Sequence, residues 1–271
     1  MHPLQVAVQD PKRQYELLKK DIDRCVLSVL ESGRWLFGER VKAFEMSFAG
    51  YCGVKYAHSV ANATDGLELA LVSAGARGRE VITAANAGGY TTTACRIVGA
   101  VPVYVDVDPD SLLMSLPAAL AAVTPATAAV VVTHLYGRLA DVVGVRSSLV
   151  SMGREDIIII EDCAQAHGAV RDGRHAGSLG DIGIYSFYPT KNLGGMGDGG
   201  AIVCNDDSLS DHLAQLRQYG WRERYHSVVP YGRNSRMDEI QAAILGVKLP
   251  HLMEWNARRR RIVRCYKDAA P

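Results

Sequence analysis

The chain has 271 residues, of which 48% are hydrophobic and 22% are charged. This length and composition provide for a folded core, and they fit one large domain or one domain with a remnant of a second. The 30 Lys and Arg residues balance 29 Asp and Glu residues, for a formal net charge of +1. Such a balance gives no sign of nucleic acid or an anionic membrane as a partner.

Two helices are predicted near the start of the chain. Residues 13–32 carry apolar side chains near helical spacing, and Gly33 is well placed to end that helix. A second helix is predicted over 39–49, where Phe44 and Phe48 lie on one face.

Short apolar runs and helix-like stretches then alternate, which favours crossover units and a mainly parallel sheet. The apolar runs lie at 81–83, 101–105, 128–133, 156–160, 182–187 and 200–204. The helix-like stretches lie at 64–75, 90–98, 115–123, 140–152, 207–218 and about 236–266. The four isoleucines at 157–160 predict a strand buried on both faces, as parallel sheets require. We expect an α/β fold with a mainly parallel, mixed seven-stranded sheet flanked by helices.

Ligands of open parallel sheets bind outside the carboxyl ends of the strands, and Asp162 follows the run that ends at Ile160. A carboxylate at that place can pair with a cationic ring nitrogen. The alternative is that Asp162 caps the next short helix.

Lys191 follows another apolar run, in a loop rich in glycine. Lysine is rarely buried without a partner, and a desolvated lysine can form Schiff bases. The alternative is a surface turn with an ordinary lysine.

A third motif, Asn62–Leu67, precedes an apolar-periodic helix. Free N–H groups and the dipole at a helix start favour a phosphate, although many helices begin with such residues. Together the three motifs offer a phosphate site, an acid for a pyridinium nitrogen and an amine for an aldehyde. These are the parts that pyridoxal phosphate requires from its protein.

These motifs resemble those of the DegT/DnrJ/StrS family of sugar aminotransferases, within the aspartate aminotransferase superfamily of fold type I. The resemblance covers about residues 28–266 in unbroken order. It is carried by Ser32–Gly38, Phe44–Glu45, Glu161–Ala169, Ser186–Asn192 and Asn234–Ala243.

The resemblance implies a role for each matching residue at the ring of the cofactor. Lys191 forms the Schiff base with pyridoxal phosphate and later carries a proton. Asp162 keeps the pyridine nitrogen protonated, and Gln165 lies near the phenolic oxygen of the ring. Dehydrating relatives carry histidine at the lysine position, so Lys191 speaks against that branch.

The resemblance also implies how the phosphate and the subunits are arranged. Thr64 and Asp65 bind the phosphate, largely through backbone N–H groups, and Ser186 adds a hydroxyl. Asn234 reaches the phosphate of the neighbouring subunit, so the active unit is a homodimer with shared sites.

The implied reaction moves an amino group from L-glutamate, or glutamine, to a keto-sugar carried on a nucleotide, in amino-sugar biosynthesis. A cyclitol such as an inosose stays open as the acceptor. A nucleotide-binding doubly wound protein is a weaker interpretation, because the first strand–helix turn lacks G-x-G-x-x-G.

The chain departs from the family pattern in two places. Family members place an aromatic residue on the cofactor ring where Gly88 stands here, and Tyr90 either supplies that ring or only begins a helix. Members are also longer and continue into a small C-terminal domain. We therefore expect a cofactor-binding large domain at 1–245 and the start of a truncated small domain at 246–271. This departure keeps open an alternative: a catalytically impaired homologue or regulatory subunit that binds the cofactor.

The remaining features have ordinary explanations. His134 and His167 are expected to make structural hydrogen bonds, and Arg258–Arg261 to form a solvated helix face. Six cysteines are scattered without a C-x-x-C pair, so no metal site is expected. The opening residues lack the basic segment and apolar core of a signal peptide, which predicts a cytoplasmic location.

Overall fold

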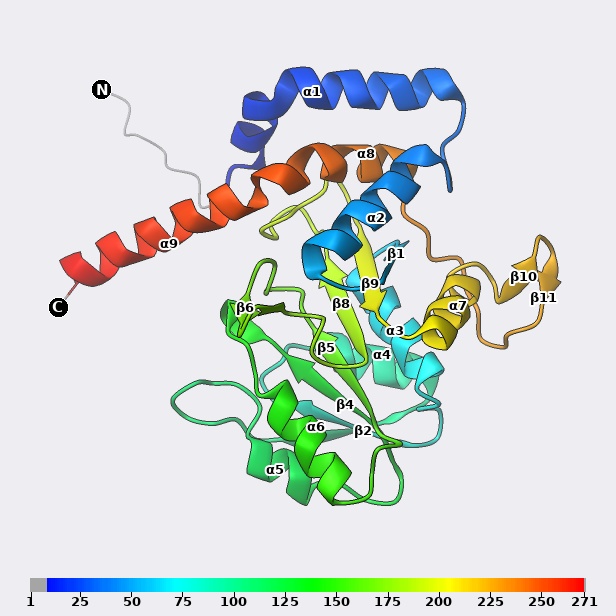
Figure 1. Ribbon diagram of the computed structural model, residues 1–271, viewed down its shortest axis with the longest axis vertical. Coiled ribbons are helices and arrows are strands. Elements are labelled where there is room, and N and C mark those ends of the chain that lie inside the picture. Colours follow the sequence, from blue (N-terminus) through cyan, green and yellow to red (C-terminus); the bar gives the residue numbers. More distant parts are fainter. Residues whose placement is uncertain (1–8, 271) are drawn as a thin grey trace.

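The computed structural model describes residues 9–270, so the opening segment that was compared with a signal peptide lies outside it. A central sheet is covered by helices on both faces, and the predicted α/β class is confirmed (Figure 1). Between residues 9 and 270, no helix is both long enough and apolar enough to pass through a membrane.

The sheet has seven strands in the order β1-β9-β8-β5-β4-β2-β3. Only β9 runs against its neighbours, and the other pairs are parallel. The strands are β1 (Tyr56–Val60), β2 (Glu80–Ala84), β3 (Val101–Val105), β4 (Thr127–Thr133), β5 (Ile158–Asp162), β8 (Ile182–Ser186) and β9 (Gly200–Cys204). Six of these match the apolar runs of the sequence, and β5 extends two residues further than its run, through Asp162.

Helices cover the two faces of the sheet in separate groups. One face carries α3 (Ala63–Ser73), α4 (Tyr90–Val98) and α7 (Asp207–Leu216). The other carries α2 (Glu39–Cys52), α5 (Leu116–Ala121), α6 (Val142–Ser151) and α8 (Glu239–Lys248). Strands β4, β5, β8 and β9 are buried almost throughout because both of their faces are covered.

The helix predicted at about 236–266 is divided in the structure. Helix α8 is followed by a 3-10 turn, η2 (Leu249–His251), and then by α9 (Leu252–Ala269). Pro250 lies in that turn, where it lacks the N–H that a continuous helix would need. Helix α1 (Pro11–Ser32) packs along α8, and α9 runs away from the sheet (Figure 1).

Three small elements were not predicted from the sequence. They are the hairpin β6 (Val170–Arg171) with β7 (Arg174–His175), the hairpin β10 (Trp221–Glu223) with β11 (His226–Ser227), and the 3-10 turn η1 (Leu135–Gly137). Each strand of these hairpins, like the turn, is two or three residues long, which is too short for a periodic pattern to appear.

Candidate active site

Asp162 and Lys191 meet at the carboxyl edge of the sheet. Asp162 is the last residue of β5, and Lys191 lies in the loop after the adjacent parallel strand β8. Both residues line one cavity of about 500 Å³. The other residues that line this cavity are Asn62, Ala63, Thr64, Leu67, Tyr90, Ala164, Ser186, Tyr188, Thr190, Asp198 and Gly199. The two side chains predicted at the carboxyl ends of strands therefore share a cavity.

The Asp162 carboxyl is almost completely buried, with 6% of the residue exposed. Its Oδ1 accepts a hydrogen bond from the Ala164 N–H at 3.1 Å, so Asp162 also holds the turn after the strand. Burial raises the pKa of Asp162, and the charge of Lys191 opposes this effect only in part. A cation placed against this carboxyl would favour its ionised form.

The Lys191 loop is closed by backbone hydrogen bonds on both sides. The Phe187 N–H donates to the Gly199 oxygen at 2.8 Å, and the Gly195 N–H donates to the Phe187 oxygen at 2.7 Å. A side chain at Gly194 would collide with backbone atoms of Pro189. Among residues 9–270, the Lys191 amine has neither a hydrogen bond nor an ion pair, which leaves it available to a ligand.

Helix α8 supports the same loop from behind, which the sequence did not indicate. The buried Lys248 amine donates to the Gly194 oxygen at 2.6 Å, and burial lowers the pKa of Lys248 to about 8. The Gln241 side-chain amide pairs with both backbone groups of Met196, at 2.9 Å each. These contacts fix the loop that carries Lys191.

The start of α3 forms another wall of the cavity, but Thr64 and Asp65 differ in position. Thr64 lines the cavity. The Asp65 N–H donates to Asn62 Oδ1 at 2.9 Å, and the Asp65 carboxylate lies 3.7 Å from an Arg233 nitrogen. Asp65 is therefore engaged elsewhere, and the free N–H groups at this helix start belong to the residues before it.

Ser186 and Tyr90 both line the cavity. Ser186 Oγ accepts a hydrogen bond from the Tyr188 N–H at 3.3 Å. Gly88 has a φ of +71°, and a Cβ on it would lie 3.4 Å from the Tyr90 ring. The Tyr90 ring thus lies beside Gly88, and 63% of Tyr90 is exposed.

Gln165 and Asn234 do not line this cavity. Gln165 Oε1 accepts a hydrogen bond from the Tyr136 N–H at 2.9 Å and lines a neighbouring cavity instead. Asn234 is exposed and forms an isolated bridge with Gln218.

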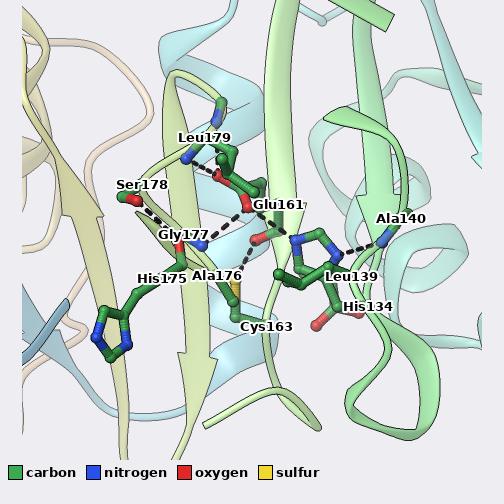
Figure 2. A network of polar contacts seen from close by, with 12 residues as sticks. His134, Leu139, Ala140, Glu161, Cys163, His175, Ala176, Gly177, Ser178 and Leu179 are labelled. Carbon is green, nitrogen blue, oxygen red and sulfur yellow. Dashed lines mark hydrogen bonds and ion pairs between the residues drawn. The ribbon is translucent and has the colours of Figure 1, made fainter. Parts of the chain in front are cut away.

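A buried polar network surrounds Glu161, the residue that precedes Asp162 in the chain (Figure 2). Glu161 is 0% exposed and accepts from His134 Nε2 at 2.7 Å and from the N–H groups of Gly177, Leu179 and Gly180. His134 Nδ1 accepts from the Ala140 N–H at 3.1 Å, which leaves the proton on Nε2. The structural role expected for His134 is thereby found.

His134, Glu161 and Cys163 form a cluster of potential metal ligands that was not predicted from the sequence, with ligand atoms within 4.8 Å of one another. Every contact of the Glu161 carboxylate is an N–H donor of the protein, so its oxygens are already committed. This arrangement is that of a structural hydrogen-bond network.

His167 differs from the expectation of a structural hydrogen bond. It is 3% exposed, and neither of its ring nitrogens has a partner within residues 9–270. The ring packs against Tyr185 and Phe187. Burial and the nearby charge of Lys191 lower the pKa of His167 to about 3, so the ring is neutral.

Four residues with polar side chains line the cavity and were not singled out from the sequence: Asn62, Tyr188, Thr190 and Asp198. Asn62 begins the helix-start motif, and Tyr188 and Thr190 belong to the Lys191 motif. Their place inside these motifs could therefore have indicated that they line the site. Asp198 lies among loop glycines, where no motif marked it as a site residue.

The residues of the cavity fit pyridoxal phosphate. A helix start with free N–H groups suits a phosphate, a buried carboxyl suits a protonated ring nitrogen, and an unpaired amine suits an aldehyde. These three groups converge on one cavity at the carboxyl edge of the sheet.

Comparisons with known proteins agree with this site. Residues 16–270 match the model of the DegT/DnrJ/EryC1/StrS aminotransferase family. The dTDP-3-amino-3,4,6-trideoxy-alpha-D-glucose transaminase of Micromonospora megalomicea subsp. nigra is 44% identical over 256 residues, which are 94% of this chain and 68% of that protein.

Two solved structures superpose closely on the chain. The crystal structure of S. venezuelae DesV in complex with a ketimine intermediate gives a TM-score of 0.92 at 40% identity and covers 97% of this chain and 70% of that one. The Bacillus subtilis NtdA structure with bound cofactor PMP gives a TM-score of 0.85 at 29% identity. The match covers 93% of this chain and 57% of that one.

Proposed function

The chain belongs to the DegT/DnrJ/EryC1/StrS aminotransferase family, and we propose that it transfers an amino group to a keto-sugar carried on a nucleotide. The cofactor of this proposal is pyridoxal phosphate. The observation that carries the proposal is the shared cavity, in which the unpaired Lys191 amine and the buried Asp162 carboxyl lie together.

Each residue has a defined task in the proposed reaction. When bound, pyridoxal phosphate supplies an aldehyde that holds the amino group and a ring that accepts an electron pair. Lys191 would hold the cofactor covalently, and its amine would take the proton from the α-carbon of the amino donor. Asp162 would keep a proton on the ring nitrogen. Thr64 and Ser186 would hold the phosphate, and Tyr90 would cover the ring.

Two of the predicted cofactor contacts depend on changes from the geometry described above. The Asp65 N–H is already bonded to Asn62, so it would have to release Asn62 in order to bind the phosphate. Gln165 would have to release Tyr136 in order to reach the phenolic oxygen of the ring.

The substrates follow from the similar proteins. The M. megalomicea relative is named for a dTDP-linked amino-sugar, so the acceptor proposed here is a nucleotide-linked keto-sugar. L-Glutamate or glutamine is the proposed donor. The bound PMP of NtdA is the aminated form of the cofactor, which is the form that a transaminase needs between its two half-reactions.

The proposal includes a homodimer in the cytoplasm. Asn234 is exposed and lies outside the cavity of its own chain, which suits a contact with the site of a partner subunit. The six cysteines, Cys25, Cys52, Cys95, Cys163, Cys204 and Cys265, are all free, as in a reducing compartment.

We also propose residues 1–245 as the cofactor-binding domain and residues 246–271 as the start of a smaller one. Every residue from Arg261 to Ala270 is exposed, including the apolar Ile262 and Val263. The outer part of α9 is thus left without packing in the described chain, as expected for a segment that serves another unit.

The first half-reaction tests the proposal against the alternative of an impaired homologue. The chain loaded with pyridoxal phosphate should convert L-glutamate to 2-oxoglutarate in one turnover, together with a change in the visible absorbance of the cofactor. Lys191→Ala should abolish both signals. A loaded wild-type chain that produces no 2-oxoglutarate would favour the impaired homologue.

A further inference from the structure

The four arginines Arg258–Arg261 do not form one uniform solvated face. Arg259 and Arg260 line a cavity of about 510 Å³ together with Lys191, His167, Gln165 and Asn192; we call it the arginine cavity. Arg258 and Arg261 line neither this cavity nor the one that holds Asp162. The structure therefore divides the run into two inner and two outer arginines.

Asn256 explains why α9 turns this face toward the site. It is 7% exposed, its amide donates to the His167 oxygen at 2.8 Å, and its Oδ1 accepts from Asn192 Nδ2 at 2.7 Å. Asn256 thus joins α9 to the segment after Asp162 and to the loop after Lys191. Residues three and four positions later share its helix face, and these are Arg259 and Arg260.

The arginine cavity is continuous with the proposed cofactor cavity. Ala164, Thr190 and Lys191 line both. Two arginines and one lysine line the arginine cavity, and none of its lining residues is acidic. A cationic cavity without a matching carboxylate suits an anionic ligand, and the planar guanidinium group pairs with carboxylates through two hydrogen bonds.

We propose that the arginine cavity binds a carboxylate of the amino donor; this inference rests on the proposed transaminase function. In an amino acid, a carboxylate is bonded directly to the carbon that gives up its proton. In a nucleotide-linked sugar, by contrast, the ring separates the phosphates from the reacting carbon. A cationic cavity with Lys191 in its wall therefore fits the donor better than the acceptor.

Glutarate, a dicarboxylate without an amine, is the probe for this site. We expect titration calorimetry of the cofactor-loaded chain to show glutarate binding, and the double variant Arg259→Gln/Arg260→Gln to weaken it by at least about tenfold. The matched control is Arg258→Gln/Arg261→Gln, which removes the same charge from the same helix and should change the affinity by less than about twofold.

Rapid mixing with L-glutamate gives a second readout. The inner double variant should raise the glutamate concentration that gives half of the maximal rate of absorbance change by about tenfold, and it should leave the KM for the keto-sugar within about twofold. Equal effects of the inner and outer pairs, unchanged glutarate binding, or a rise confined to the KM of the keto-sugar would each overturn the assignment.

The titration also separates this inference from the proposed function. Glutarate is to be titrated into the chain with and without pyridoxal phosphate, and loading is followed by visible absorbance. Failure to load the cofactor would count against the transaminase proposal alone. Absence of glutarate binding in a chain that loads the cofactor would count against the arginine cavity alone.

Discussion

At the scale of single residues, Asp162 is held in a state that suits a cationic ligand. Its carboxyl is buried at the end of a central strand, and burial raises its pKa. A protonated ring nitrogen beside it would recover the electrostatic energy that desolvation removes. The ionised carboxyl therefore destabilises the cofactor-free chain, and it would stabilise the protonated ring of the bound cofactor.

This cost predicts a pH-dependent effect of Asp162→Asn on the cofactor-free chain. A raised pKa means that the folded state binds the proton more tightly, so wild-type stability falls as the pH rises above about 4, the pKa of an unfolded Asp. The neutral variant lacks this loss. Urea denaturation at pH 7 should find the variant more stable than the wild type, with a smaller difference near pH 4. A variant less stable at pH 7 would contradict the reasoning.

Glu161 is the structural counterpart of Asp162 on the same strand. All four of its hydrogen-bond partners are N–H donors, so a side chain that itself donates would face a donor. Glu161→Gln would turn an amide N–H toward these donors and should lower the free energy of unfolding by about 2 kcal/mol. Urea denaturation measures the loss, and a change below about 0.5 kcal/mol, typical of surface substitutions, would show that the network has little effect on stability.

Asp162 and Lys191 could be predicted from the sequence because both follow strands that end at one edge of the sheet. The partners of Gln165 and Asp65 could not, because they depend on side-chain contacts rather than on strand position. The hydrogen bond from Tyr136 to Gln165 joins residues 29 positions apart. No local pattern records such a pairing.

At the scale of elements, one buried carboxylate of α8 caps the start of α2. The Glu239 carboxylate is 3% exposed and accepts from the N–H groups of Gly38, Arg40 and Val41 at 2.8–2.9 Å. It thereby satisfies the open N–H groups at the start of α2 and complements the helix dipole there. A side chain on Gly38 would lie 2.8 Å from this carboxylate, so glycine fits that position.

Removal of this cap should destabilise the chain. We expect Glu239→Ala to lower the free energy of unfolding by about 2 kcal/mol, because three buried N–H groups lose their acceptor. Glu39→Ala is the control, since the Glu39 side chain is 76% exposed at the same helix start and pairs only with Lys42. It should cost less than about 0.5 kcal/mol. Similar losses in the two variants would contradict the cap.

Most elements followed from periodicity, and the exceptions have physical reasons. Strand β1 was missed because His58 and Ser59 interrupt its apolar pattern; both are satisfied by distant partners, His58 by Ser210 at 2.9 Å and Ser59 by Glu45 at 2.7 Å. The long final helix was predicted without a break because its apolar residues continue across Pro250.

At the scale of the whole molecule, the proposed site is open on one side. Tyr90 and Tyr188, which line the cofactor cavity, are 63% and 52% exposed, and Tyr136 of the arginine cavity is 67% exposed. Aromatic side chains at the mouth of a site are typical of interface surfaces. A partner subunit that contributes Asn234 would complete the enclosure.

Mixed dimers test the shared site. Lys191→Ala and Asn234→Ala should each have little activity as homodimers, because each lacks one part of every site. When the two variants are refolded together, half of the dimers are hybrids with one intact site, and activity should return to about a quarter of the wild-type value. If the mixture is no more active than the two variants apart, each site belongs to one chain.

The lysine that holds the cofactor covalently can be located by mass spectrometry. The chain is loaded with pyridoxal phosphate, reduced with borohydride, digested and analysed by mass spectrometry. We expect the added mass to lie on Lys191, the amine without a partner among residues 9–270 at the cavity of Asp162. Cofactor attached to another lysine, such as the buried Lys248, or to none would contradict it.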